Sequence, residues 1–191
     1  MGKALIVIVF CGLILFQCAC GQVKTAEPEI AANAIKTATP ESKSAYPALR
    51  SQAQEMDDAV LSGDYLKAAD YFYPALVAKA GGKEKMAAVL KGQIAQMKAE
   101  GYEIVSITVG EASQVEKVDD SLFAVLPVST TMKAPNKKAV GESSLVGISG
   151  DGGTTWKFID GIDQARFSRI FPKAAEKIKI PDEQAPKTIE N

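Results

Sequence analysis

Hydrophobic positions recur with helical spacing through residues 46–100. The first predicted helix carries them three or four residues apart, at Leu49, Ala53, Met56 and Val60. Pro47 suits the first turn of that helix, and Asp64 is placed to cap a second helix that Pro74 interrupts. Gly81 and Gly82 then precede a long third helix over about residues 83–100. This stretch therefore predicts a helical half of a domain.

From Tyr102 onward the spacing of apolar residues changes from about 3.6 to two. Alternation of apolar and polar residues predicts four strands, over about 105–109, 121–132, 137–148 and 154–160. Short turn-forming connections between them indicate an antiparallel meander. A last helix is expected over 163–171, ended by Pro172. Because the sheet and the long helix both carry apolar stripes, we expect that helix to cover one face of the sheet.

Helices followed by sequential strands predict an α+β fold, with N-terminal helices on a curved antiparallel sheet of about four strands and a short C-terminal helix. We place this domain at residues 46–180. Residues 22–45, rich in Ala, Thr, Pro, Glu and Lys, are expected to form a flexible linker. The polar residues 181–191 are expected to form a disordered tail.

Residues 1–21 have the composition of an export signal peptide. Lys3 supplies a positive start, residues 4–16 form an apolar run, and small residues follow. All three cysteines lie here, so the exported domain has no thiol chemistry. The segment resembles bacterial lipoprotein signals, which implies acylation of Cys20 or, as the alternative, Cys18, and a lipid anchor in the membrane of the cell envelope. The competing route is ordinary cleavage after Gly21, which would leave a soluble periplasmic or secreted protein.

Composition excludes several kinds of chemistry. The chain of 191 residues has no histidine and a net charge of −1. Without histidine or an exported cysteine there is no imidazole-based triad and no soft-metal site, so we expect no metal and no cofactor. Because basic residues are not in excess or clustered with aromatic ones, we expect no nucleic-acid partner.

One short motif is specific. Residues 149–156 read Ser-Gly-Asp-Gly-Gly-Thr-Thr-Trp and resemble the Asp-box at every fixed position: Ser149, Asp151, Gly153, Thr155 and Trp156. Asp151 can accept hydrogen bonds from turn amides, and the glycines permit a positive φ. Because the motif occurs once in a chain too short for a propeller, we interpret it as a stabilised hairpin rather than a glycosidase relic.

The order and lengths of the elements resemble the NTF2-like (cystatin-like, SnoaL-like) cone fold over about residues 50–170. Two stretches, 71–86 and 151–161, are similar to uncharacterised exported bacterial proteins of that fold. The resemblance implies a cone that, in some members, hosts isomerases and dehydratases using Asp, Tyr or His. The catalytic candidates it suggests are Asp70, Tyr71, Tyr73 and Asp160, and it also implies a homodimer.

Three functional classes are consistent with these features. The first is a non-catalytic envelope module that binds a protein partner or a small apolar ligand. The second is a histidine-free acid/base enzyme of the isomerase or dehydratase type, and the third is an inhibitor or immunity-type protein. We favour binding over catalysis, because none of the four candidates matches a known catalytic position.

Overall fold

The computed structural model describes residues 45–134 and 137–189. The predicted signal peptide, with Cys18 and Cys20, and almost all of the predicted linker lie outside these residues. Within them, four helices precede the sheet: α1 (Pro47–Ser62), α2 (Tyr65–Tyr71), α3 (Pro74–Ala80) and α4 (Lys83–Ala99). Asp64 caps α2 by accepting a hydrogen bond from the backbone N–H of Lys67. None of the helices in the described ranges has the length and apolar character needed to cross a membrane.

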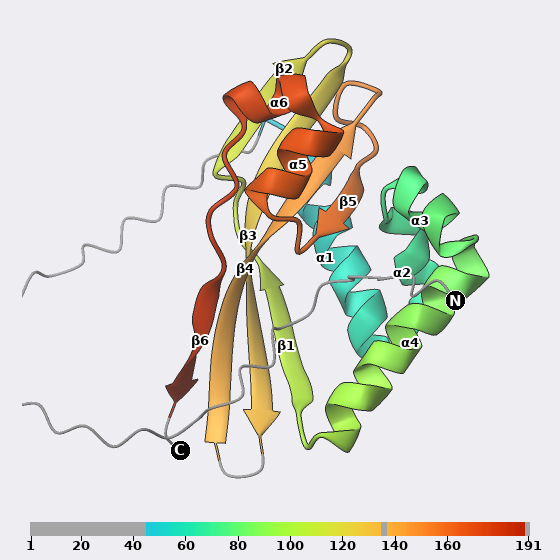
Figure 1. Ribbon diagram of the computed structural model, residues 1–191, viewed down its shortest axis with the longest axis vertical. Helices are drawn as coiled ribbons and strands as arrows, with labels where there is room; N and C mark the ends of the chain where they lie inside the picture. Colours follow the sequence, from blue (N-terminus) through green and yellow to red (C-terminus); the bar gives the residue numbers. More distant parts are fainter. Residues whose placement is uncertain (1–44, 135–136, 190–191) are drawn as a thin grey trace, which may run out of the picture.

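The sheet is antiparallel and curved (Figure 1), which confirms the predicted α+β class. It has six strands rather than about four: β1 (Glu103–Val109), β2 (Gln114–Val118), β3 (Ser121–Ala134), β4 (Lys137–Ser149), β5 (Lys157–Asp160) and β6 (Gln184–Ile189). Strands β3 and β4 form its centre. Strands β1 and β2 both pair with the outer edge of β3, and β5 and β6 both pair with the outer edge of β4.

The expected last helix is α5 (Gln164–Ile170), which ends before Pro172 as predicted. A further helix that was not expected, α6 (Pro172–Lys177), follows with Pro172 in its first turn, and one expectation about the tail is wrong. The tail expected to be disordered contains β6, which pairs with β4 from Lys138 to Glu142. Strand β6 pairs there because the outer edge of β4 offers backbone donors and acceptors that no other strand uses within the described ranges. Pro186 is tolerated in β6 because β6 is an edge strand.

Both faces of the upper half of the sheet are buried. On one face α1 covers a core that includes Leu126, Leu145, Trp156 and Phe158. On the other face α5 and α6 cover a second core centred on Phe123, Val146 and Phe167. Figure 1 shows α5 and α6 on the near side of the strands and α1 behind them.

The helix that covers the inner face is α1, not the long helix α4. The main contacts of α4 are with α2 and α3, and in Figure 1 only its C-terminal end lies near the start of β1, while the rest of the helix runs away from the sheet toward α3. Only Met86 and Ala87 of α4 are buried. Leu49 of α1 lies so close to β4 that a Cβ at Gly147 would come within 2.9 Å of its Cδ1. The expected pairing of long helix and sheet is therefore wrong.

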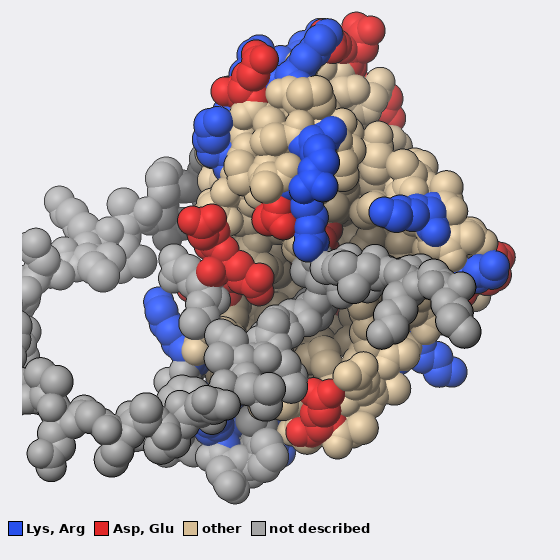
Figure 2. Space-filling view, viewed as in Figure 1, with Lys and Arg blue, Asp and Glu red and all other residues tan. Residues whose placement is uncertain are grey.

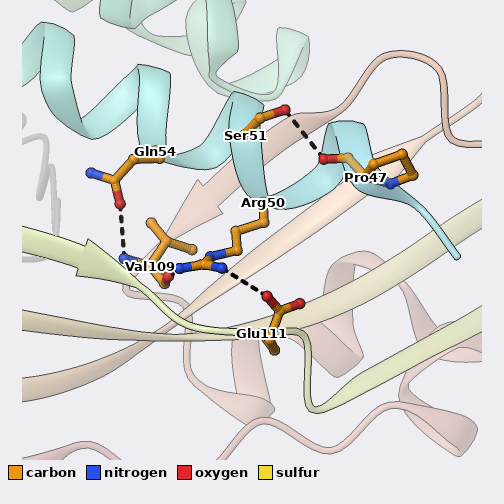
Figure 3. A network of polar contacts seen from close by, with 6 residues as sticks. All are labelled: Pro47, Arg50, Ser51, Gln54, Val109 and Glu111. Atoms are coloured by element: carbon orange, nitrogen blue, oxygen red, sulfur yellow. Dashed lines mark hydrogen bonds and ion pairs between the residues drawn. The ribbon is translucent and has the colours of Figure 1, made fainter. Parts of the chain in front are cut away.

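Side chains of α1 occupy the hydrogen-bonding edge of β1 (Figure 3). The Gln54 amide donates to the Ile107 carbonyl at 3.1 Å and accepts from the Val109 N–H at 3.1 Å. Arg50 Nε donates to the Val109 carbonyl at 3.0 Å and also pairs with Glu111 at 2.8 Å. Backbone groups of an edge strand that would otherwise have no protein partner are thus bonded to the helix.

Replacing Gln54 with alanine should lower the free energy of unfolding by about 1–3 kcal/mol, because two part-buried backbone groups of β1 lose their partner. Urea denaturation followed by circular dichroism would measure the loss. The matched control is Gln96→Ala, whose exposed amide bonds only Glu100 on its own helix and should cost less than about 0.5 kcal/mol. Equal losses for the two variants would contradict a clamping role for Gln54.

Candidate functional site

The structure does not bring the four sequence-based catalytic candidates together. Asp70 is exposed and forms an ion pair with Lys83 at 2.6 Å. Tyr71 donates its hydroxyl hydrogen to the Glu55 carboxylate, which is the main reason why its pKa rises to about 12. Tyr73 packs edge-on against Phe171 in the second core, on the opposite face of the sheet from Phe158. Among the four, Asp160 is the one left in a setting suited to binding or proton transfer.

Asp160 is the last residue of β5 and lies on the inner face of the sheet. It is two residues from Phe158, which belongs to the core under α1, and alternation places both side chains on that face. It pairs across the ladder with Leu145 and is half-buried. Burial raises the pKa of Asp160 to about 6; the N–H of Gly161 lowers it, and the nearby charge of Glu183 raises it further.

The charge of Asp160 acts on Asp57 of α1, which is not among the candidates selected from the sequence. Asp57 is only 8% exposed, and its Oδ2 has no hydrogen-bond partner among the described residues. Burial, followed by the charges of Asp160 and Asp58, raises the pKa of Asp57 to about 8. A signal was present in the sequence: Asp57 is one helical turn after Ala53, so it falls on the buried side of a helix where an aliphatic residue is the usual choice.

The edge of β4 is incomplete next to this pair. The pairing of β5 ends at Leu145, and that of β6 begins at Glu142. Ser143 and Ser144 therefore have no strand partner on that edge within the described ranges. We call the site formed by Asp57, Asp160, Glu183 and this gap at residues 143–144 the acidic notch. In Figure 2 acidic side chains gather beside the segment leading from α6 to β6, which carries Asp182 and Glu183.

A separate hollow lies on the helical half of the molecule. It encloses about 380 Å³ and lies between the start of α2 and the side of α4. Its lining includes Leu66, Ala87 and Lys91, and it is open to solvent. Neither Asp57 nor Asp160 borders it, and its charged groups are on the surface. We therefore assign the chemistry to the acidic notch, where an unsatisfied polar atom is buried.

The Asp-box segment forms a compact turn between β4 and β5. Oδ1 of Asp151 accepts hydrogen bonds from the N–H groups of Thr154 and Thr155 and from the hydroxyl of Ser149, and Oδ2 accepts one from the hydroxyl of Thr155. The bonds from Thr155 contribute most to lowering the pKa of Asp151 to about 2. Trp156 is fully buried and donates to the Gly153 carbonyl at 3.0 Å. The hydrogen bonds of the Asp151 carboxylate lie within the turn, so the Asp-box segment has the geometry of a structural element.

No group of three or more His, Cys, Asp or Glu side chains in the described parts of the chain is arranged to hold a metal ion. The acidic notch contributes two inward carboxyls and one exposed one from Glu183. At neutral pH, a pKa of about 8 keeps Asp57 mainly protonated, while a pKa of about 6 leaves Asp160 mainly ionised. The notch thus presents a carboxylic acid beside a carboxylate, and this arrangement can donate one hydrogen bond and accept several.

Asp57 should make the protein less stable as pH rises from about 4 to about 8. The folded state holds the Asp57 proton up to about pH 8, whereas the unfolded chain releases it near the ordinary value of 3.8. In that window the folded state binds more protons, so ionisation favours unfolding. Asp57→Asn should flatten this slope and raise the free energy of unfolding at pH 7.5 by roughly 2–4 kcal/mol.

Chemical denaturation at several pH values between 4 and 8.5 would measure both effects. Asp58→Asn is the matched control, because it removes the same charge from the exposed neighbour and should leave most of the slope in place. An Asp57→Asn variant with the wild-type slope would contradict the buried, protonated state of Asp57.

Comparison with known proteins adds no assignment to this geometry. Neither the protein-family models nor the curated proteins give a match to the chain.

Proposed function

We propose that the protein is a non-catalytic binding module of the bacterial envelope, and that its acidic notch contacts the ligand or partner. The observation that carries this proposal is the Oδ2 atom of Asp57, which is buried without a hydrogen-bond partner among the described residues. A buried polar atom that lacks a hydrogen-bond partner costs about 1–3 kcal/mol, and a bound group that supplies the partner removes that cost.

The neighbouring backbone supports the same proposal. Ser143 and Ser144 are flanked by β5 and β6 but lack a strand partner on that edge within the described ranges. Peptide groups on an open strand edge bind ligands or extended peptide segments readily. The notch therefore combines a carboxyl that needs a donor with main-chain groups that can fix the orientation of what binds.

The wider setting is also part of the proposal. Helices packed on a curved antiparallel sheet are compatible with the NTF2-like cone, which would place the notch on its inner face. The apolar run of residues 4–16 followed by Cys18 and Cys20 supports export and lipid anchoring. An anchored module would then display the domain on the arm formed by residues 22–45.

Intact mass measurement of the protein from native membranes tests the anchor. We expect the mature chain to begin at Cys20 and to carry a diacylglyceryl group and an acyl chain. Cys20→Ser should lose this modification, whereas Cys18→Ser should keep it. A bare chain beginning near Gln22 would contradict lipid anchoring and indicate a soluble exported protein.

A metabolite extract provides the probe for binding. We would add the fraction below 3 kDa from bacterial cells to the ¹⁵N-labelled protein and record amide chemical shifts. The amides near Asp57, Ser143 and Asp160 should shift, and Asp160→Asn should abolish the shifts. Asp119→Asn, which removes the same charge at the ion pair with Lys173, serves as the control and should leave them unchanged. No shift at the notch, or equal shifts in Asp160→Asn, would contradict the proposal.

One observation favours acid/base catalysis as a second candidate. Asp57 and Asp160 hold different protonation states at neutral pH, which suits a general acid beside a general base. The same experiment separates the two functions, because a binding module releases its compound unchanged. A compound recovered with altered mass, or with deuterium incorporated from D₂O, would support the enzyme.

A further inference from the structure

We infer that the acidic notch selects an organic cation, an ammonium or guanidinium group. This inference rests on the proposed binding function and narrows it to a class of ligand. It depends on the charge balance of the notch, on the geometry of the two inward carboxyls and on the side chains around them.

The charge of the notch is not balanced within the described part of the protein. The charges acting on Asp57 come from Asp160 and Asp58, and the charge acting on Asp160 comes from Glu183. None of the ion pairs among the described residues includes any of these four acids. Besides burial, repulsion among these acids helps to keep Asp57 protonated at neutral pH, and the remaining acids form no ion pair among the described residues, so a bound positive charge would stabilise the site.

Basic residues on the same elements have other partners. Arg50 is the one basic residue of α1, and it bonds Glu111 and the Val109 carbonyl. Lys157 is the one basic residue of β5, and its Nζ donates to the Asp70 carbonyl at 2.6 Å. The elements that supply the two inward carboxyls therefore have no spare cation, and no ion pair among the described residues supplies a counter-charge to them.

The geometry favours an organic cation over a bare metal ion. Calcium takes six to eight oxygen ligands, and no metal-binding group of acidic side chains is present in the described ranges. An ammonium has three donors and a guanidinium five, which suits one hydrogen bond to Oδ2 of Asp57 and another to the Asp160 carboxylate.

Titration of the full protein with simple cations tests the inference. The probes are n-butylammonium and n-butylguanidinium chloride, with n-butanol as the neutral analogue and CaCl₂ as the metal, followed by amide chemical shifts. We expect saturable shifts near Asp57 and Asp160 with the two organic cations. Asp160→Asn should weaken their binding at least tenfold, and the control Asp119→Asn should change it less than twofold.

A second pair of probes identifies the source of the cation. Acetyl-Gly-Lys-Gly-amide and its Nε-acetylated form compare a lysine side chain with its neutral counterpart. Tighter binding of butylammonium indicates a free amine as ligand, and tighter binding of the unmodified peptide indicates a basic side chain of a partner protein. Both results support recognition of a cation.

Two results would overturn the inference. One is that butanol or the acetylated peptide shifts the notch amides as strongly as the charged probes. The other is that CaCl₂ binds at the notch while the organic cations do not. If the metabolite extract binds but the organic cations fail, the cation inference is wrong and the binding function stands; if neither binds, both are wrong. Asp57→Asn should fold stably, so loss of cation binding in that variant reports on the site and not on unfolding.

Discussion

The fold depends on side-chain amides of α1 that bond to the backbone of the sheet. Gln54 bonds Ile107 and Val109 of β1, and Gln52 bonds the Thr154 carbonyl and the Trp156 N–H at 3.0 and 2.8 Å. A glutamine amide has the donor and acceptor of a peptide group, so each residue takes the place of a missing strand neighbour. Gln114 of β2 and Gln164 of α5 use their amides in the same two-point manner to bond the backbone of residues 178–180, between α6 and β6. Helix α1 therefore joins the two outer edges of the sheet.

These hydrogen bonds between α1 and the sheet explain how the carboxyl of Asp57 can remain buried. Asp57 is one turn beyond Ala53 on a helix whose position is fixed by Leu49, Gln52 and Gln54. The helix cannot rotate to expose the carboxyl without breaking these bonds and opening the core around Trp156. Burial of Asp57 is thus imposed by the rest of α1, and the local instability is tolerated because the surrounding contacts outweigh it.

Local patterns in the sequence predicted most of the elements, and long-range contacts decided the rest. The apolar stripe of α1 and the Asp-box turn are local, and residues 47–62 and 149–156 behave as their spacing indicates. Strand β6 depends on an open edge of β4 some forty residues away, which no local pattern in a polar, proline-containing tail reveals. Val105 alternates as a buried residue should, yet it is 52% exposed, because the register of β1 shifts between Ile104 and Ser106.

The candidate site was predictable only in part for the same reason. Asp160 can be selected from the sequence because it ends a strand with alternating apolar and polar residues. The alternation does not predict which other acidic residue lies near it in the fold. Asp57 is about a hundred positions earlier in the chain, and its importance follows from the packing of α1 on the inner face rather than α4. Tyr71 and Tyr73 carry hydroxyls that suit acid/base chemistry. In the structure the hydroxyl of Tyr71 is bonded to Glu55, and the ring of Tyr73 packs against Phe171.

The position of α1 in the chain has a consequence for folding. Gln52 is made early in synthesis, but its partners Thr154 and Trp156 are 102 and 104 positions further along. Until those residues exist, α1 has neither its core nor its polar partners, and a 16-residue helix is only marginally stable alone in water. Contacts of such long range slow folding. Helix α1 thus lacks its partners in the fold until the last strands are made.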